Sequence, residues 1–488
     1  MFASKKLPAK ACANVKKFRY LLNGFMHRNT MFPTPSTLHK SEAINSTSGC
    51  IVGRPSKTAY PEQTNMVEAQ RHDQYNTSTD GRGFTVTVAE AVVRNLNTGF
   101  LRGLQQGSWK ACWREDDSST FAPAPGPAQK ERKRLIPISD LKDVKMPELT
   151  CSFASELNPY YEAVREECEE WISVVATPTT PQAHKFLLDC QLPRLVCRCL
   201  PNVPEHAVPR LLQTMKMISW LLIADSEDDD PSEMGSDYMA TSSRSHSIMA
   251  ILYGNDSIPT PCSGTYNAER LGGLKAREQF LNGFRELCGE ILPSMSPKLR
   301  ARFVSSMASY LDSLKIQAAF RRVNHIPDVH FYMDIRRQAS FMYPAFVLGE
   351  YVLGLELEEV VHSDRFVLDI QDIAVDFVNL CNDVVSCRQE ASEGDYFNLP
   401  SILYINQPNS CLKLTFQEAL DITAHITRDL DNRCALLQRR LDDTYTSHST
   451  AMHTFMKVLL NSMSGCLTWF LESARYKVAP LPQRNVMP

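Results

Sequence analysis

Five carboxylates lie within six consecutive positions of the chain, 225–230. Residues 221–233 read LLIADSEDDDPSE, an apolar run followed by Asp225, Glu227, Asp228, Asp229 and Asp230. Such an acidic run is usually a solvated surface. If the apolar helix continues for one more turn, however, Asp225, Asp228 and Asp229 share a face, because residues three and four apart are neighbours on a helix. Like charges there repel unless a cation lies between them, and oxygen ligands suit a hard ion such as Mg²⁺.

A second set of oxygen donors repeats at a regular spacing. In VNLCNDVVSCRQEA, the residues Asn382, Ser386 and Glu390 follow one another at intervals of four. At about 100° per residue they drift little and line one side of a helix. The preceding turns are apolar, so this polar stripe emerges from a helix that packs into the core, where polar groups need partners. A metal ion would satisfy all three together, whereas any one of them alone could make an ordinary hydrogen bond between helices.

Composition limits the classes of protein that could carry these residues. The chain has 488 residues, of which 43% are hydrophobic and 22% charged, as in a globular protein with a sizeable core. Lysine and arginine total 52 against 55 acidic residues, so the net charge of −3 predicts no nucleic-acid partner. No apolar run is long enough to span a membrane. Fifteen scattered cysteines without a CxxC pair favour a reducing compartment, and we expect a cytoplasmic protein.

The two parts of the chain differ in character. Residues 1–135 are rich in Ser, Thr, Asn, Pro and Gly and end in APAPGPAQKERKR, so we predict a largely disordered N-terminal extension. Its first 41 residues contain eight Lys or Arg and no acid, a composition that organelle targeting sequences share with plain disordered tails. Residues 136–488 form the predicted folded domain.

Helical periodicity dominates this domain, and strand alternation is nearly absent. We therefore predict an all-α domain of many helices around one central space. In 155–172, Ser155, Asn158 and Pro159 predict the helix start. Residues 240–270, rich in Ser, Thr, Pro and Gly, predict a long loop. The remaining predicted helices are 206–225, 274–292, 297–322, 330–354, 365–391, 416–445 and 451–477.

Four ordered motifs resemble those of one enzyme family. Asn382-Asp-Val-Val-Ser386-Cys-Arg-Gln-Glu390 fits the NDxxSxxxE metal-binding motif of class I terpene synthases, and DSEDD at 225–229 looks like their aspartate-rich motif. WFLESARY matches the family's Trp-x5-Arg-Tyr signature at Arg475 and Tyr476, and Arg336 stands where the family carries its diphosphate-sensing arginine. The resemblance covers about residues 145–480 and is strongest to the fungal trichodiene synthase-like group.

This resemblance implies a class I terpenoid synthase-like helical bundle around a central active-site cavity. It implies three Mg²⁺ ions, with Asp225, Asp228 and Asp229 holding two and Asn382, Ser386 and Glu390 the third. Arg336, Arg475 and Tyr476 would bind the diphosphate of an isoprenoid substrate, of which farnesyl diphosphate fits best, and Asn382 would lie beside it. The product would be a cyclic sesquiterpene hydrocarbon or alcohol. The resemblance also allows a homodimer. Candidate aromatic wall residues are Trp220, Tyr332, Phe341, Tyr343 and Trp469.

Two points stay open at the level of sequence. The family's usual adjacent aspartates are broken here: either Asp225 takes the first place and Ser226 replaces the second aspartate, or Ala224 has replaced the first. The alternative functions are a prenyl diphosphate chain-elongating transferase, which would carry two aspartate-rich motifs, and a non-catalytic helical interaction protein. No DxDD string is present to predict cyclisation started by protonation.

Overall fold

A computed structural model describes residues 134–178, 180–229, 234–255, 273–407, 413–444 and 450–477, with backbone alone at 227–229, 273–277 and 442–444. Nearly all of the predicted N-terminal extension lies outside these residues, so the extension stays a prediction. The described part contains no β-strand, which confirms the all-α fold. Its helices are α3 (Ile138–Leu141), α4 (Tyr161–Ala176), α5 (Pro181–Asp189), α6 (Leu192–Cys199), η2 (Glu205–Ala207), α7 (Val208–Asp229), η3 (Met234–Ser236), α8 (Tyr238–Leu252), α9 (Gly273–Ser294), α10 (Pro297–Val323), α11 (Val329–Ala339), α12 (Met342–Leu353), α13 (Glu359–Ser363), α14 (Arg365–Glu393), α15 (Leu399–Ile405), α16 (Phe416–Thr444), α17 (Thr450–Glu472) and η4 (Ala474–Tyr476).

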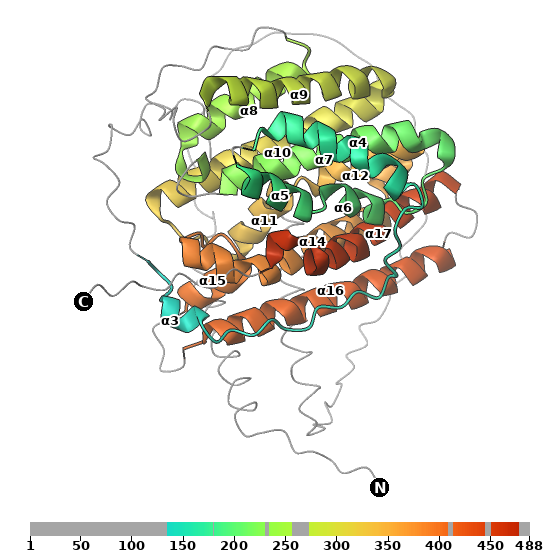
Figure 1. The fold of residues 1–488 in the computed structure, drawn as a ribbon. Helices are drawn as coiled ribbons and strands as arrows, with labels where there is room; N and C mark the ends of the chain where they lie inside the picture. Colours follow the sequence, from blue (N-terminus) through green and yellow to red (C-terminus); the bar gives the residue numbers. More distant parts are fainter. Residues whose placement is uncertain are drawn as a thin grey trace, which may run out of the picture. The chain divides into compact units, whose positions relative to one another are not determined.

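Helix α14 lies at the centre of the packing that builds the site. It contacts α11, α15, α16 and α17, while α7 packs on α4, α6, α9 and α12 (Figure 1). Large apolar side chains fill the space between them, with Trp220, Phe377 and Trp469 each at most 1% exposed. The hydrophobic effect therefore fixes the helices that carry the candidate ligands in a common core.

The segment that precedes α4 lies along α16 (Figure 1). The backbone of Lys145 exchanges hydrogen bonds of 2.7 and 2.9 Å with the Gln417 side chain, and Asp431 accepts bonds from the backbone and hydroxyl of Ser152. These contacts tie the start of the described chain to a helix almost 300 positions later, and they cover the outer side of α16.

The predicted helix 330–354 is wrong as a single element. The chain leaves α11 after Ala339 and begins α12 at Met342, with Phe341 at a φ of 45° between them. This left-handed conformation is unusual for a bulky residue and cannot occur inside a helix. Pro344, in the first turn of α12, has no backbone N–H to donate and is tolerated there. The break places Phe341 against the cavity described below.

The predicted loop 240–270 is also wrong in part, because residues 238–252 form α8. Asp237 caps the helix by accepting from the backbone N–H groups of Met239 and Ala240. The serines that suggested a loop turn their hydroxyls back onto the helix: Ser245 donates to the carbonyl of Thr241 and Ser247 to that of Ser243. Such back-bonding lets a serine-rich segment stay helical. Residues 256–272 lie outside the described residues.

The predicted start of the helix in 155–172 is corrected as well. The helix α4 begins at Tyr161, and its N-cap residue, Tyr160, makes no capping bond through its side chain. Asn158 lies before it, 1% exposed, and donates a bond of 2.7 Å to the carbonyl of Leu200. Its side-chain oxygen accepts a bond of 2.9 Å from the backbone N–H of Tyr160, so the side chain forms a turn just before α4 and joins it to the end of α6.

Candidate active site

A cavity of about 450 Å³ brings the predicted site residues together. Helix α7 contributes Asp225, α11 contributes Arg336, and α14 contributes its polar stripe, while η4 closes one side. All seven predicted residues with described side chains line it: Asp225, Arg336, Asn382, Ser386, Glu390, Arg475 and Tyr476. The side chains of Asp228 and Asp229 lie outside the described residues, although α7 does continue through Asp229.

Hydrogen bonds hold both helix α14 and the polar stripe on it in place. Asp364 caps the helix by accepting from the N–H groups of Phe366 and Val367, and the helix runs unbroken past Glu390. The Ser386 hydroxyl donates a hydrogen bond of 2.8 Å to the carbonyl of Asn382, and the Asn398 amide donates one of 2.7 Å to the Glu390 carboxylate. These bonds fix oxygen atoms on the cavity side of the helix, as the interval of four predicts.

The end of α7 supports the first of the two possible registers. Ala224 is 2% exposed and belongs to the core, whereas Asp225 and Ser226 line the cavity. Tyr310 donates a bond of 3.4 Å to Asp225. An aspartate at position 224 would project into the apolar core, where its charge would be costly. The geometry thus favours Asp225 as the leading acidic residue, with Ser226 beside it.

Three groups that could bind an anion converge from two elements, Arg336 from α11 and Arg475 and Tyr476 from η4. The Nη2 atom of Arg336 donates a hydrogen bond of 2.7 Å to Oδ1 of Asn382. The Nδ2 atom of Asn382 donates one of 3.0 Å to the hydroxyl of Tyr476. The Nη1 atom of Arg475 donates 2.6 Å to the hydroxyl of Ser226. Guanidinium groups bind phosphate oxygens strongly because charge assists each hydrogen bond. The arrangement can therefore neutralise an anionic group held between α7 and α14.

Aromatic packing holds η4 against this cavity. The Tyr476 ring meets Trp469 edge-on at 5.6 Å and Phe470 at 5.1 Å between ring centroids. The indole N–H of Trp469 donates 2.9 Å to the carbonyl of Cys190, and the Ser473 hydroxyl donates 3.0 Å to the same oxygen. Burial raises the pKa of Tyr476 to about 12, so its hydroxyl keeps its proton at neutral pH and can donate it in a hydrogen bond.

Only part of the predicted aromatic wall is found. Phe341 and Trp469 line the cavity, but Trp220, Tyr332 and Tyr343 do not. Trp220 stacks on Phe280 at 4.5 Å in the core. The two tyrosines donate instead to carboxylates of α14 outside the cavity, at Asp383 and Asp372. A spacing pattern does not tell which side of a buried helix a ring occupies.

Comparison with known proteins agrees with this geometry. Residues 265–430 match the model of terpene synthase family 2, C-terminal metal binding. The chain is 25% identical over 328 residues to alpha-muurolene synthase of Coprinopsis cinerea, covering 67% of this chain and 72% of that protein. It is 25% identical over 330 residues to sesquiterpene synthase Agr3 of Cyclocybe aegerita, covering 67% and 86%.

The chain is similar to terpene synthases in its matched domain and in these relatives. It is thus a terpene cyclase, and the matched metal-binding domain, which contains Arg336 and the α14 stripe, implies a divalent metal ion. The fold agrees, since germacradien-4-ol synthase from Streptomyces citricolor superposes with a TM-score of 0.53 at 19% identity, over 66% of this chain and 97% of that one. None of the described helices is long and apolar enough to cross a membrane.

The donors around this terpene synthase cavity fit a hard cation. Asp225, Asn382, Ser386 and Glu390 offer carboxylate, amide and hydroxyl oxygens, which Mg²⁺ prefers over softer metals. Among the described residues, no three His, Cys, Asp or Glu side chains are grouped so that they could hold a metal. A metal held by the described side chains alone would therefore use the amide and hydroxyl of α14 as well as carboxylates.

Sequence reasoning missed several residues that support these donors. Asp383 belongs to the NDxxSxxxE motif but had no predicted role; it is 1% exposed and accepts a bond from Arg336. Asn398, which donates to Glu390, and Phe470 on the cavity wall were not predicted either. Asp383 had one available signal, its place inside the motif. Asn398 and Phe470 had none, because only the fold brings them to the site.

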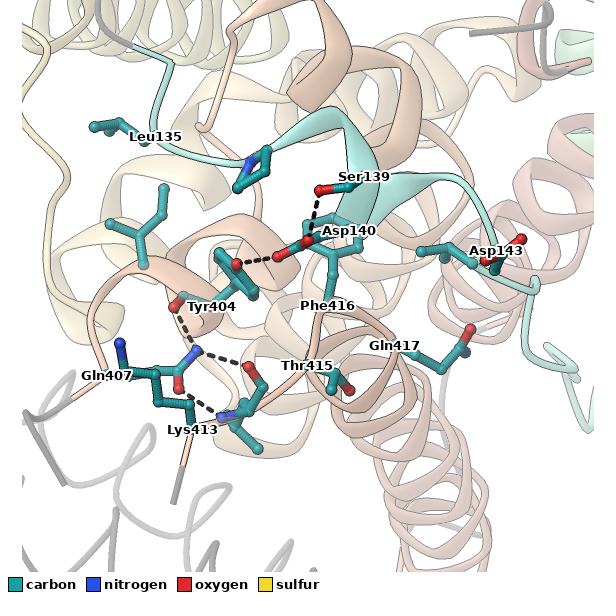
Figure 2. A pocket seen from close by; sticks show the side chains of 14 residues that line it. Leu135, Ser139, Asp140, Asp143, Tyr404, Gln407, Lys413, Thr415, Phe416 and Gln417 are labelled. Atoms are coloured by element: carbon teal, nitrogen blue, oxygen red, sulfur yellow. Dashed lines mark hydrogen bonds between the residues drawn. The ribbon is translucent and has the colours of Figure 1, made fainter. Parts of the chain in front are cut away.

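A second, open pocket of about 740 Å³ lies where α3 meets the ends of α15 and α16. Figure 2 shows its polar side chains bonded within the pocket: Tyr404 donates a bond of 2.6 Å to Asp140, and Gln407 donates to the backbone carbonyls of Tyr404 and Leu414. None of the predicted site residues lines it. The smaller cavity, which collects all of those with described side chains, is the candidate active site.

Proposed function

We propose that this protein is a Mg²⁺-dependent sesquiterpene synthase that ionises farnesyl diphosphate and cyclises the resulting carbocation, with release of diphosphate. One observation carries the proposal: acidic and neutral oxygen donors from α7 and α14 line a single cavity with Arg336, Arg475 and Tyr476. The names of the two sesquiterpene-forming relatives described above support the choice of a fifteen-carbon substrate.

The cation sites follow from the two donor-bearing helices. We assign Asp225, with Asp228 and Asp229, to two Mg²⁺ ions, and Asn382, Ser386 and Glu390 to a third. When bound, these ions supply positive charge that stabilises the departing diphosphate. Arg336, Arg475 and Tyr476 supply hydrogen bonds to its oxygens from the protein side. The carbon–oxygen bond of the allylic substrate then breaks with both electrons leaving on the diphosphate.

The apolar part of the same cavity suits the carbocation that is left. Phe341, Trp469 and Phe470 lie on its wall. Aromatic faces attract a cation through their quadrupole, and an apolar surround excludes water until cyclisation is complete. Loss of a proton then gives a cyclic hydrocarbon, and capture of one water followed by loss of a proton gives an alcohol. Membership of the trichodiene synthase-like group and a cytoplasmic homodimer are further parts of this proposal.

Product analysis tests the proposal. The purified chain is incubated with geranyl, farnesyl or geranylgeranyl diphosphate and Mg²⁺, and the volatile products are separated and identified by mass spectrometry. We expect cyclic fifteen-carbon products from farnesyl diphosphate and loss of all turnover with EDTA. The proposal is wrong if no cyclic fifteen-carbon product forms, or if EDTA leaves turnover unchanged.

A further inference from the structure

Helix α14 carries a second polar stripe beside the one that lines the cavity. Asp376, Asn379 and Asp383 follow at intervals of three and four and are each at most 3% exposed. All three bind the adjacent arginines at the end of α11. Asp376 accepts two bonds of 2.6 Å from Arg337, and Asn379 donates 3.1 Å to the carbonyl of Arg336. This stripe therefore fixes the end of α11 against α14.

Asp383 makes the contact nearest the cavity. Its Oδ1 atom accepts a hydrogen bond of 3.3 Å from Nε of Arg336. Its Oδ2 atom accepts from the hydroxyl of Tyr332 and, at 2.9 Å, from the backbone N–H of Leu399. Tyr332 is itself fully buried and packs on Phe397 with ring centroids 5.8 Å apart. A buried carboxylate with donors on both oxygens has little freedom to move.

Neither Asp383 nor Tyr332 lines the cavity, so neither can touch the substrate there. Arg336, in contrast, bonds Asp383 through Nε and Asn382 through Nη2, at 3.3 and 2.7 Å. A guanidinium group is planar and rigid, so bonds at these two nitrogens set the orientation of the whole fork. The orientation of Arg336 toward the cavity thus depends on Asp383, which Tyr332 in turn holds in place.

We propose that Asp383 and Tyr332 are positioning residues, whose function is to hold the Arg336 guanidinium where it binds the diphosphate of the substrate. This inference rests on the proposed function, which gives Arg336 its diphosphate. Preorganisation of this kind improves binding because the arginine need not be ordered when the ligand arrives.

A double-mutant cycle provides the test. Asp383→Asn removes a buried countercharge and can prevent folding, so the main variant is Tyr332→Phe, which keeps the buried ring and removes only the hydroxyl. The matched control is Tyr343→Phe, because Tyr343 also donates to a carboxylate of α14, Asp372, at 2.9 Å, but does not line the cavity. Each change is made in the natural chain and in an Arg336→Gln background, with circular dichroism to confirm folding.

The measured quantity is the Kd for inorganic diphosphate in the presence of Mg²⁺, by titration calorimetry on the full chain. Loss of a hydrogen bond to a charged group predicts about tenfold weaker binding for Tyr332→Phe in the natural chain. Without Arg336 the same change should alter Kd by less than about twofold, because residues that act through one another are not additive. Tyr343→Phe should stay within about twofold of its parent in both backgrounds, since its partner Asp372 pairs with Arg337, whose guanidinium Asp376 also holds, and not with the Arg336 fork.

Equal losses from Tyr332→Phe in the two backgrounds, or an equal loss from Tyr343→Phe, would overturn the positioning role alone. Diphosphate binding by a chain that converts no prenyl diphosphate would overturn the proposed function alone and leave the cycle measurable. Failure of the natural chain to bind diphosphate with Mg²⁺ would overturn both.

Discussion

The side-chain amide of Asn382 accepts a hydrogen bond of 2.7 Å from Arg336, a residue 46 positions earlier in the chain. The same amide donates 3.0 Å to Tyr476, 94 positions later. One residue of the α14 stripe therefore joins α11 and η4, the two elements that carry anion-binding groups. Metal binding and diphosphate binding would share this contact, so a change at Asn382 should disturb both.

The α14 stripe gives the first prediction. Asn382→Ala and Glu390→Gln should each lower kcat on the order of a thousandfold, because a lost ligand removes several kcal/mol of charge stabilisation. Steady-state kinetics at several Mg²⁺ concentrations provide the measurement. The control is Glu286→Gln, an exposed glutamate on α9 away from the cavity, which should behave as the natural chain does. Near-normal kcat in either α14 variant would remove these residues from the metal site.

The register of the acidic motif gives the second prediction. Asp225→Asn should lower kcat on the order of a thousandfold by weakening metal binding. Ser226→Ala loses one bond from Arg475 and should cost only about fivefold. Ala224→Asp places a carboxylate in the core and should destabilise the fold without raising activity. If Ala224→Asp instead restored turnover to the Asp225→Asn variant, the alternative register would be the right one.

These sites show what the sequence could predict and why. The intervals of four that join Asn382, Ser386 and Glu390 are a local property of one helix, and the structure does place all three on one side. The long helices α9, α10, α14 and α16 were predictable for the same reason, since their apolar periodicity extends over many turns. Local patterns of this kind survive tertiary packing.

Other features depend on contacts between distant segments. Nothing near Phe341 in the sequence announces its positive φ, which lies at the junction of α11 and α12. The short helix α15 was missed, although Asn398 caps it and also bonds Glu390. The rings of Tyr332 and Tyr343 look like wall residues by type, but carboxylates on α14 hold them elsewhere. Composition and spacing do not encode these partners.

Close approach of α17 and α6 gives the third prediction. A Cβ atom on Gly465 would lie 2.8 Å from the carbonyl carbon of Arg198, so the two backbones must separate to admit it. Gly465→Ala should lower the free energy of unfolding by about 1–3 kcal/mol and displace the cavity wall at Cys466 and Trp469. Urea denaturation and kcat provide the measurements.

The matched control for this substitution is Gly289→Ala. Gly289 lies within α9, and no atom comes within 4 Å of its added Cβ. Alanine is the better helix former, so the control should gain about 0.4–1 kcal/mol of stability. Equal effects of the two substitutions would argue against close helix packing at Gly465.

The pH dependence of stability gives the fourth prediction. Burial raises the pKa of Glu350 from 4.5 to about 7, although Arg302 opposes the shift. Between these pH values the folded chain holds a proton that the unfolded chain has released, so this group's contribution to stability is lost as pH rises. The slope would reach about 1.4 kcal/mol per pH unit inside the window. The Nε2 atom of His362 lies 3.7 Å from a carboxylate oxygen of Glu350. Burial lowers the pKa of His362, so its contribution to stability rises with pH and opposes that of Glu350.

Glu350→Gln should remove this contribution. Urea denaturation of the variant and the natural chain at pH 5, 6, 7 and 8 gives the comparison. We expect the stability of the natural chain relative to the variant to decline between pH 5 and 7 and to level off above pH 7. Parallel curves across the whole range would show that Glu350 ionises normally.

A crystal structure of the full chain with Mg²⁺ and inorganic diphosphate tests the central claim most directly. We expect metal ions held between Asp225 on α7 and Asn382, Ser386 and Glu390 on α14, with the diphosphate bonded to Arg336, Arg475 and Tyr476. Metal ions bound without these α7 and α14 residues, or diphosphate bound instead in the open pocket beside α3, would contradict it.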